Sequence, residues 1–444
     1  MNSIVEGVCH VLMSLDMLPI IAHSKTGAAE EVARRLSVRL SDAVKEGSLS
    51  DSTSSSYGRP LILLVDRTSD IATALHHPFT YRGLLVEVGG MRLNKCTVRG
   101  ADGNDEVVEI DPDRDNFYLE NAAREFGVIG ENIQEALAAY KAEYQALAEQ
   151  SAGGGDDSYS DANAMSRLLA TAPLLAEEKR SLDTHAKLAY SFLRVIQDRL
   201  LDHFHGVESG ILRGNMDRAE VTRLLGSSNC SLEDRQRLFL IAYLMAAPGS
   251  EEAAFVEKQA PLLERNVSLA PELDTKRAPT SFPAFQYLKH LRSWTVNKTG
   301  DQSAANEGAG WGFAQQFVKN IASSLARGAE VDLPLTKLVS ALSQDAADVT
   351  SYQSSQEATL RQKLLDTVAA VDPRNRKTVN LHHVRFSQTL VFTIGGGSIA
   401  EYDDLKRWES TRGGSKSVYY GCTSIVSGEE LLKQLSILGS DLQK

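Results

Sequence analysis

Residues 60–94 read PLILLVDRTSDIATALHHPFTYRGLLVEVGGMRLN, and this stretch decides the fold class. It begins with Leu61–Val65, a continuous aliphatic run of the kind found in strands that are buried on both faces of a sheet. His77 and Pro78 interrupt the chain, and Thr80–Val88 then has the apolar spacing of a helix. A buried strand that is followed by a helix indicates a parallel sheet covered by helices.

The same alternation extends toward the N-terminus. Ser3–Asp16 and Thr26–Glu46 carry apolar residues at helical spacing, and the short apolar run Leu18–His23 between them predicts a strand. Gly47–Gly58 consists mostly of Ser, Asp, Thr and Gly, which is typical of a surface loop. This part of the chain therefore has the character of an α/β domain.

The pattern changes after about Gly100. From there to Arg385 we find no strand pattern, and apolar residues recur at intervals of three and four. The strand pattern returns in Thr389–Ile394 and Val418–Tyr420, and a helical segment follows each of them. These observations predict an α/β + α protein, in which a parallel-sheet α/β domain is interrupted by a large helical insertion.

We place the discontinuous α/β domain in residues 1–100 and 381–444, and the helical domain in residues 101–380. Within the helical domain, two seams have the heptad spacing of a coiled coil. They occupy residues 133–147 and 165–200, with a polar insert between them. We therefore predict a coiled-coil-like antiparallel hairpin over about residues 131–205.

Pro173 lies inside the second seam. A proline in a helix interior removes a hydrogen bond and clashes with the preceding turn, at a cost of about 3 kcal/mol. The apolar spacing nevertheless continues through it. Two interpretations stay open, namely a hinge within one helix and the end of a short helix.

The composition excludes several classes of function. The net charge of −11 argues against nucleic acid or an anionic membrane as the main partner. No apolar run approaches the ~18 residues that a membrane span needs. The four cysteines are far apart and form no C-x-x-C pair, which excludes a zinc ribbon. We find no catalytic constellation and predict neither a metal site nor a cofactor.

Two turns are candidate ligand sites. Asp66, Arg67 and Asp70 directly follow a buried strand, and ligands bind beyond the carboxyl ends of such strands. These residues could hold a metal or a phosphate, or they could form a structural turn in which the acids cap a helix and the arginine is ion-paired. We favour the structural turn, because no further ligand follows at metal-binding spacing.

The second turn, Gly395-Gly396-Gly397-Ser398-Ile399-Ala400, satisfies the pattern G-x-G-x-x-A that cradles a pyrophosphate. The ribose-binding acid expected about 20 residues further on is missing. We therefore interpret Gly395, Gly396 and Gly397 as a tight strand-to-helix turn. A nucleotide- or phosphate-binding enzyme that uses this loop is the alternative function.

Residues 60–94 resemble the Sec-one/Munc-eighteen (SM) family, whose members carry a buried strand, an Asp-Arg turn, a D-x-A-T-x-L-x-H run and a T-Y-x-x-L helix. The C-terminal segments LVFTIGGGSIAEYDDLKRW and VYYGCTSIVSGEELLKQLSILG are similar to the end of the same family. The doubled histidine at His76 and His77, the triple glycine and the Tyr-Gly-Cys turn at Tyr420–Cys422 resemble its ER-to-Golgi branch.

This resemblance implies a non-enzymatic scaffold that binds SNARE proteins, both syntaxin-type SNAREs and R-SNAREs, and promotes their assembly in vesicle transport and membrane fusion. It implies a cytoplasmic protein in peripheral association with ER and Golgi membranes, which it contacts only through SNAREs. Tethering factors and small GTPases are further candidate partners, and nucleic acid is not.

The family's helical domain extends a hairpin that straightens at a proline to template an R-SNARE. Pro173 falls at that position, which favours the hinge interpretation. The residues expected to contact SNARE helices are Leu168, Leu169, Pro173, Leu174, Leu175, Lys179 and Leu182.

This sequence departs from the family pattern at its front. The family carries an N-terminal α/β domain and the first part of the sheet domain before the position that matches Ser3, and neither is expected here. In the ER-to-Golgi branch that the sequence resembles, the pocket for the syntaxin N-terminal peptide lies in that N-terminal domain. We therefore assign no residue to N-peptide binding.

Overall fold

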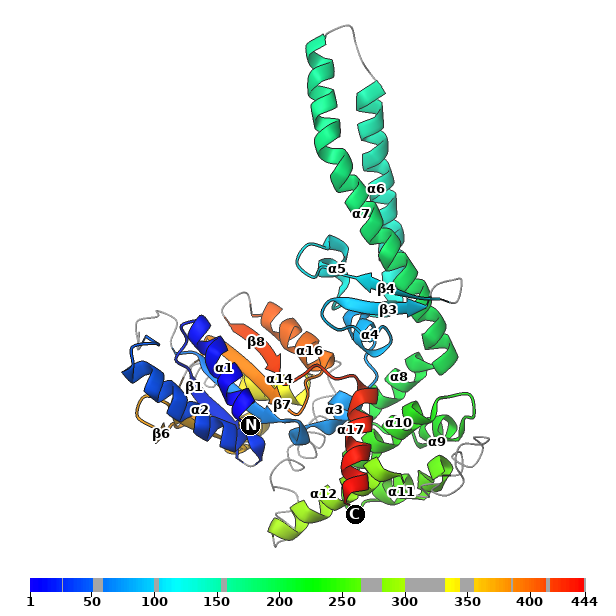
Figure 1. The fold of residues 1–444 in the computed structure, drawn as a ribbon. Helices are drawn as coiled ribbons and strands as arrows, with labels where there is room; N and C mark the ends of the chain where they lie inside the picture. Colours follow the sequence, from blue (N-terminus) through cyan, green and yellow to red (C-terminus); the bar gives the residue numbers. More distant parts are fainter. Residues whose placement is uncertain are drawn as a thin grey trace. The chain divides into compact units, whose positions relative to one another are not determined.

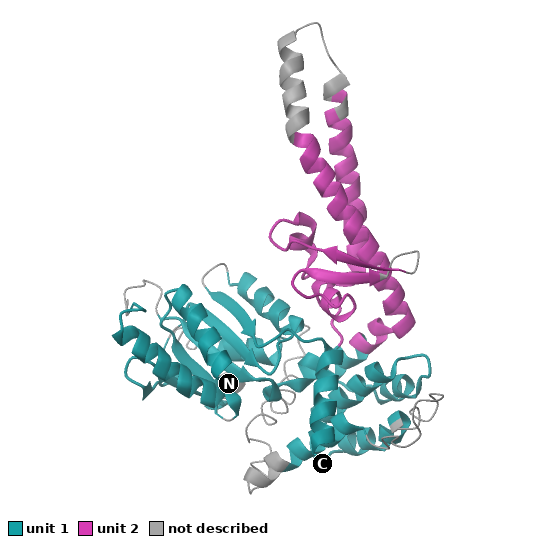
Figure 2. Ribbon diagram, viewed as in Figure 1, with its two compact units in different colours: residues 1–76, 206–444 teal, residues 77–205 magenta. Residues whose placement is uncertain are grey.

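The computed structural model describes residues 1–25, 27–50, 59–99, 104–152, 158–264, 282–299, 332–343, 355–384, 386–412 and 416–442. The chain divides into two compact units, the first formed by residues 1–76 and 206–444 and the second by residues 77–205 (Figure 2). Residues 206–380, which we expected to belong with the hairpin, thus group with the sheet. The domain boundaries at residues 100 and 381 remain a prediction.

The first unit contains a six-stranded sheet in the order β6-β5-β1-β2-β7-β8. The four strands that the sequence predicts are present, and each is parallel to its neighbour among them. They are β1 (Ile20–Ser24), β2 (Leu61–Asp66), β7 (Gln388–Ile394) and β8 (Ser417–Cys422). All six residues of β2 are buried, as its aliphatic run predicts.

The sheet is mixed rather than wholly parallel, which corrects the prediction. β5 (Val368–Asp372) pairs antiparallel with β1, and β6 (Lys377–Thr378) pairs antiparallel with β5. Both strands fall in the region where we found no strand pattern. β6 has only two residues and β5 contains two alanines, so neither shows the run of β-branched residues by which strands are identified.

Helices cover both faces of this sheet (Figure 1). One face packs against α1 (Asn2–Ser14) and α2 (Ala28–Lys45) through Ile62 and Leu64 of β2. The other face packs through Leu61, Leu63 and Val65 against α14, α15 and α16. Those three helices span Pro334–Ser343, Ser355–Asp366 and Ile399–Ser410. Because successive residues of β2 face opposite helical layers and both layers are apolar, the run Leu61–Val65 is continuously aliphatic.

The remaining helices of the first unit pack on one another. They are α3 (Ile71–Leu75), α9 (Arg218–Gly226), α10 (Leu232–Met245), α11 (Glu251–Glu264), α12 (Pro283–Thr299) and α17 (Gly428–Asp441). The C-terminal α17 packs mainly on α12, α10 and α3, although we expected it to complete the sheet domain. Short 3-10 turns lie at Arg67–Ser69 and Leu381–His383.

The second unit combines a small sheet with two long helices. β3 (Lys95–Arg99) and β4 (Asp105–Glu109) pair antiparallel, and the sequence pattern predicted neither. The helices α6 (Ile129–Ala152) and α7 (Ser158–Arg199) lie side by side (Figure 1). The other elements are α4 (Tyr81–Glu87), α5 (Asn116–Asn121), a 3-10 turn at Phe126–Val128, and α8 (Leu201–Leu212), which ends in the first unit.

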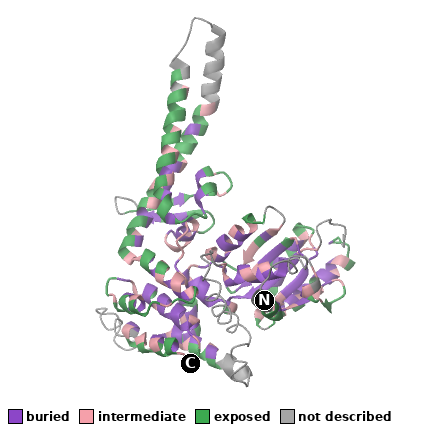
Figure 3. Ribbon diagram, turned by 180° about the vertical axis from the view of Figure 1, so that it is seen from behind, coloured by how far each residue is buried: buried purple, intermediate pink, exposed green. Residues whose placement is uncertain are grey.

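The described residues on both sides of the polar insert between the two seams are helical, because α6 runs to Ala152 and α7 begins at Ser158. Much of the described outer surface of α6 and α7 is exposed, whereas the central strands β1, β2 and β7 of the main sheet are mostly buried (Figure 3). Tyr144 and Leu193, both assigned to the heptad seams, are 56% and 45% exposed. The seams are therefore only partly covered.

We predict that Gly439→Ala destabilises the fold. Gly439 lies in α17 where a Cβ atom would overlap the backbone carbonyl of Pro283 at the start of α12. Backbone cannot move aside cheaply, so we expect a loss of about 1–3 kcal/mol in the free energy of unfolding, measured by urea denaturation.

The matched control is Gly7→Ala, also inside a helix, where a Cβ would meet nothing within 4 Å. That change should stabilise the fold by about 0.5–1 kcal/mol, because alanine favours helix over glycine. Equal effects of the two substitutions would contradict the close approach of α17 and α12.

Candidate functional site

The two candidate turns meet at one edge of the main sheet. β2 and β7 are adjacent and parallel, so the turns that follow them lie side by side. The Arg67 guanidinium donates to both carboxylate oxygens of Glu401, at 2.6 and 3.0 Å, and also to the carbonyl oxygens of Gly396 and Asp70. Both side chains of this ion pair are buried.

Sequence reasoning missed Glu401, although a signal was present. Ser398 and Glu401 form the S-x-x-E pattern of a capping box at the start of α16, and the structure contains that box. Burial opposes the charge on Arg67, but the facing carboxylate outweighs it and raises the pKa of the guanidinium. The guanidinium of Arg67 is therefore held in its charged form.

The two acids of the first turn cap helices. The Asp66 carboxylate accepts hydrogen bonds from the amide of Ala29 at the start of α2, at 3.1 and 3.2 Å. Asp70 accepts one from the amide of Thr73 in α3, at 3.0 Å. Burial raises the pKa of both acids. Gly27 has φ +92°, and a Cβ there would lie 2.5 Å from Asp66, so this approach requires glycine.

The glycine turn is filled by the protein itself. The amides of Gly395 and Gly396 both donate to Thr423 Oγ1, at 3.1 Å, and the Gly397 amide donates to the carbonyl of Ser424. A Cβ at Gly397 would lie 2.6 Å from Tyr420 Oη. The amides that would cradle a pyrophosphate are thus already bonded.

Charge also disfavours an anion at this turn. The Glu401 carboxylate lies at the N-terminus of α16, where a phosphate would have to bind, and it accepts a 2.6 Å hydrogen bond from the Tyr420 hydroxyl. The tyrosine hydroxyl in turn accepts from the Ser398 amide at 3.0 Å. The geometry does not support the alternative of a nucleotide-dependent enzyme.

A second buried polar cluster lies in the second unit, and sequence reasoning did not find it. His185 of α7 is fully buried; its Nδ1 lies 2.6 Å from Tyr81 Oη and its Nε2 lies 3.0 Å from both carboxylate oxygens of Asp115. Asp115 also accepts from the Ser181 hydroxyl and from the Tyr118 amide. Burial favours the neutral acid, but these hydrogen bonds outweigh it and lower the pKa of Asp115.

This cluster ties one face of α7 to the starts of α4 and α5. It is enclosed by Phe117, whose ring centroid lies 4.8 Å from that of His185. We interpret this cluster as an anchor that fixes α7 in place around Ser181 and His185.

The residues predicted to contact SNARE helices divide by exposure. Leu175 and Leu182 are 4% and 2% exposed, and Leu182 belongs to the core of the second unit. Leu174 is 65% exposed, and Pro173 and Lys179 are exposed as well. The side chains of Leu168 and Leu169 lie outside the described residues. Among the described side chains of the predicted set, Pro173, Leu174 and Lys179 are therefore the accessible ones.

A hollow of about 560 Å³ lies along α7 next to these residues. Three of its side chains are basic and one is acidic. It is lined by Ala176, Lys179, Arg180, Asp183, Thr184, Ala186 and Lys187. The small side chains of Ala176, Thr184 and Ala186 lie among these cations, so this face can accept a helix that carries acidic side chains.

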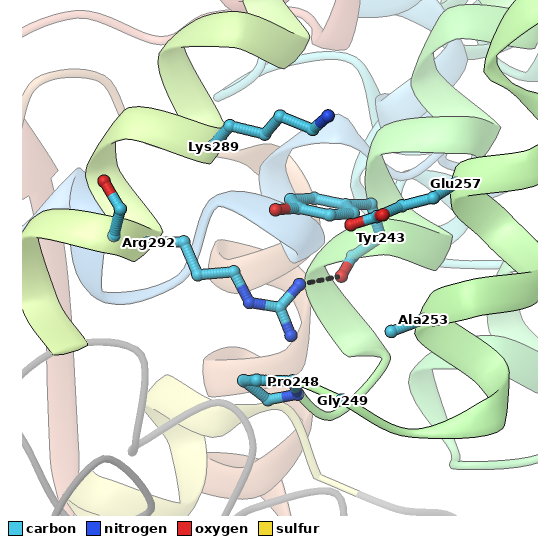
Figure 4. A pocket seen from close by; sticks show the side chains of 8 residues that line it. Tyr243, Pro248, Gly249, Ala253, Glu257, Lys289 and Arg292 are labelled. Carbon is cyan, nitrogen blue, oxygen red and sulfur yellow. Dashed lines mark hydrogen bonds between the residues drawn. The ribbon is translucent and has the colours of Figure 1, made fainter. Parts of the chain in front are cut away.

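A separate hollow of about 320 Å³ lies in the first unit between α10, α11 and α12 (Figure 4). Arg292 points into it and donates to the carbonyls of Tyr243, at 3.3 Å, and Ala246, at 2.7 Å. These contacts satisfy the C-terminus of α10. The guanidinium of Arg292 in this hollow therefore has a structural role.

Within the described residues, no helix is both long enough and apolar enough to cross a membrane. The same residues contain no group of three or more His, Cys, Asp or Glu side chains that could hold a metal ion.

Comparison with known proteins gives a consistent result. The sequence model of the Sec1 family matches residues 1–434. The chain is 28% identical to the SEC1 family transport protein SLY1 of Arabidopsis thaliana over 476 aligned residues, which cover 99% of this chain and 70% of that protein.

Two solved structures are similar in fold. Sly1p in complex with an N-terminal peptide of Sed5p matches with a TM-score of 0.69 at 22% identity, over 99% of this chain and 68% of that one. The SM protein Vps45 in complex with the Qa SNARE Tlg2 matches with a TM-score of 0.66 at 18% identity, over 99% and 70%.

We predict that Glu401→Gln destabilises the fold by about 3–5 kcal/mol, because it removes the carboxylate that pairs with the buried Arg67 guanidinium. The matched control is Glu429→Gln, which removes an exposed ion pair with Lys433 and should change stability by less than about 0.5 kcal/mol. Urea denaturation measures both. Similar effects of the two substitutions would argue against a buried ion pair at the strand ends.

Proposed function

The chain belongs to the Sec1 family, and on that premise we propose that it is a non-enzymatic scaffold that binds SNARE proteins and promotes SNARE complex assembly in ER–Golgi vesicle transport and membrane fusion. The family match over residues 1–434 carries this proposal. The name of the Arabidopsis relative, a transport protein, supports it. So does the glycine turn, whose amides are already bonded within the protein.

The partners follow from the same comparisons. Sly1p is bound to a peptide of Sed5p, and Vps45 is bound to a Qa SNARE. We propose that this chain likewise binds a syntaxin-type SNARE, together with an R-SNARE. Tethering factors and small GTPases are further candidates for its recruitment.

We propose a cytoplasmic location with peripheral association to ER and Golgi membranes. The membrane contact would come from the bound SNAREs, which carry the anchors. A net charge of −11 supports this, because an acidic protein gains nothing from approaching an anionic bilayer directly.

The functional division that we propose follows the predicted domains: residues 1–100 and 381–444 form the α/β base, and residues 101–380 form the helical domain with its hairpin at about 131–205. The compact units divide the chain differently because α3, α10 and α17 pack together. This packing joins the α/β base, which includes α3 and α17, to the part of the helical domain that includes α10. We propose that the two parts nevertheless have different roles.

The hairpin face of α7 is where we place the SNARE helix. Leu174 offers an exposed apolar side chain, and Lys179, Arg180 and Lys187 follow along the neighbouring hollow. An amphipathic helix binds such a surface with its apolar face against the leucine and its acidic residues near the cations. A SNARE segment that is ordered in this way forms the complex at a smaller entropic cost.

Pro173 supplies the proposed hinge. It lies inside α7, which runs as one helix from Ser158 to Arg199, so it does not end a short helix in this structure. Proline has no amide hydrogen, so one helical hydrogen bond is missing at this point. The weakened turn allows α7 to bend or straighten at Pro173, on the N-terminal side of the part that His185 anchors.

We predict that Leu174→Ser weakens binding of an R-SNARE motif peptide about tenfold or more, because burial of a leucine side chain contributes about 1.5–3 kcal/mol. Isothermal titration calorimetry measures the affinity. The control is Ile437→Ser in α17, which removes a side chain of similar exposure (62%) from the other unit and should leave the affinity unchanged. Equal affinities for both variants would place the binding surface elsewhere.

We predict that Pro173→Ala stabilises the straight form of α7 and strengthens R-SNARE binding, with at most about 3 kcal/mol available from helix propensity. Pro261→Ala is the control, because Pro261 lies inside α11 of the first unit. It should raise stability without changing the affinity. If Pro173→Ala leaves both the affinity and the conformation of the hairpin unchanged, Pro173 is not a hinge.

A further inference from the structure

Among the residues that the structure describes, β8 is one of the two edge strands of the main sheet and pairs with β7 alone. Its register shows which groups face away from β7. The amides of Ser417 and Thr423 donate to carbonyls of the β7 side, at 2.8 and 3.1 Å, and residues alternate along a strand. Val418, Tyr420 and Cys422 therefore direct their backbone N–H and C=O groups outward.

The outward groups of Val418 are already occupied by side chains of α16. The Val418 amide donates to Glu409 Oε1 at 3.1 Å, and its carbonyl accepts from Lys406 Nζ at 2.8 Å. The two side chains also pair with each other at 2.7 Å. Together they make the two hydrogen bonds that a neighbouring strand would make at this residue.

We propose that Lys406 and Glu409 form an edge guard, which closes β8 against pairing with a second copy of this chain. An open strand edge is a template for another strand, and charged side chains are one of the ways in which proteins block it. The strand sequence SVYYGC is rich in residues that favour β-structure, so it needs such a block.

The geometry of self-pairing explains why one guarded residue is sufficient. Two antiparallel copies of β8 related by a two-fold axis at Tyr420 would place Val418 of each copy opposite Cys422 of the other. A guard at Val418 therefore blocks both ends of the pairing. Only the central Tyr420 position would remain, which is too short for a stable interface.

This inference does not depend on SNARE binding. It gives α16 a second use: its first turn holds Arg67 through Glu401, and its last turns terminate the sheet. Lys406 also lies over the Tyr419 ring, 5.9 Å from its centroid, which keeps the lysine near the strand.

The test is the double variant Lys406→Ala/Glu409→Ala of the full chain. We expect the wild type to be monomeric and the double variant to form a dimer, with the mass by light scattering doubling as concentration rises. In the dimer, the Tyr420 amide should exchange its hydrogen at least tenfold more slowly. The control is Glu429→Ala/Lys433→Ala, which removes an exposed ion pair of equal length on α17 and should stay monomeric.

Three results would overturn the proposal: a folded double variant that keeps the monomer mass at every concentration, association that leaves Tyr420 unprotected, or a wild type that already pairs through β8. If the double variant does not fold, Lys406→Met replaces it. That change keeps the aliphatic stem near Tyr419 and frees the Val418 carbonyl alone. Because one of the two hydrogen bonds of the guard is then lost, the Lys406→Met protein should form dimers at high protein concentration. A Lys406→Met protein that stays monomeric at every concentration would also refute the guard.

Discussion

The ion pair between Arg67 and Glu401 joins residues that are 334 positions apart in the chain. It lies just beyond the carboxyl ends of β2 and β7, which are adjacent and parallel. Both charges are buried, and a buried charge is tolerated only with its partner in place. The pair therefore requires the distant halves of the sheet to be assembled together, whatever the intervening helices do.

Parts of this fold could be predicted because their signals are local. The aliphatic run of β2 and the helical spacing of α1, α2 and α16 are properties of a few neighbouring residues. β5 and β6 could not be identified, because their pairing with β1 depends on a partner far along the chain and they are short and alanine-containing. The Tyr81–His185–Asp115 cluster is equally non-local, since its members come from three separate helices or their caps.

The candidate sites show the same limit. A glycine pattern specifies a backbone turn, and only the structure reveals that Thr423 and Tyr420 fill the space in which a nucleotide would bind. Glu401 was visible as a capping-box residue, but its pairing with Arg67 was not. On α7 the apolar spacing predicted the seam, yet it did not distinguish Leu182, which is buried in the unit's own core, from Leu174, which is exposed.

The proposed role depends on the face of α7 near Pro173, and hydrogen–deuterium exchange of the full chain tests it most directly. The chain would be measured alone and with syntaxin-type and R-SNARE motif peptides. We predict slower exchange of α7 amides in residues 171–187, with α16 and the Gly395–Gly397 turn unchanged. Protection confined to the first unit, with residues 171–187 unaffected, would contradict the account.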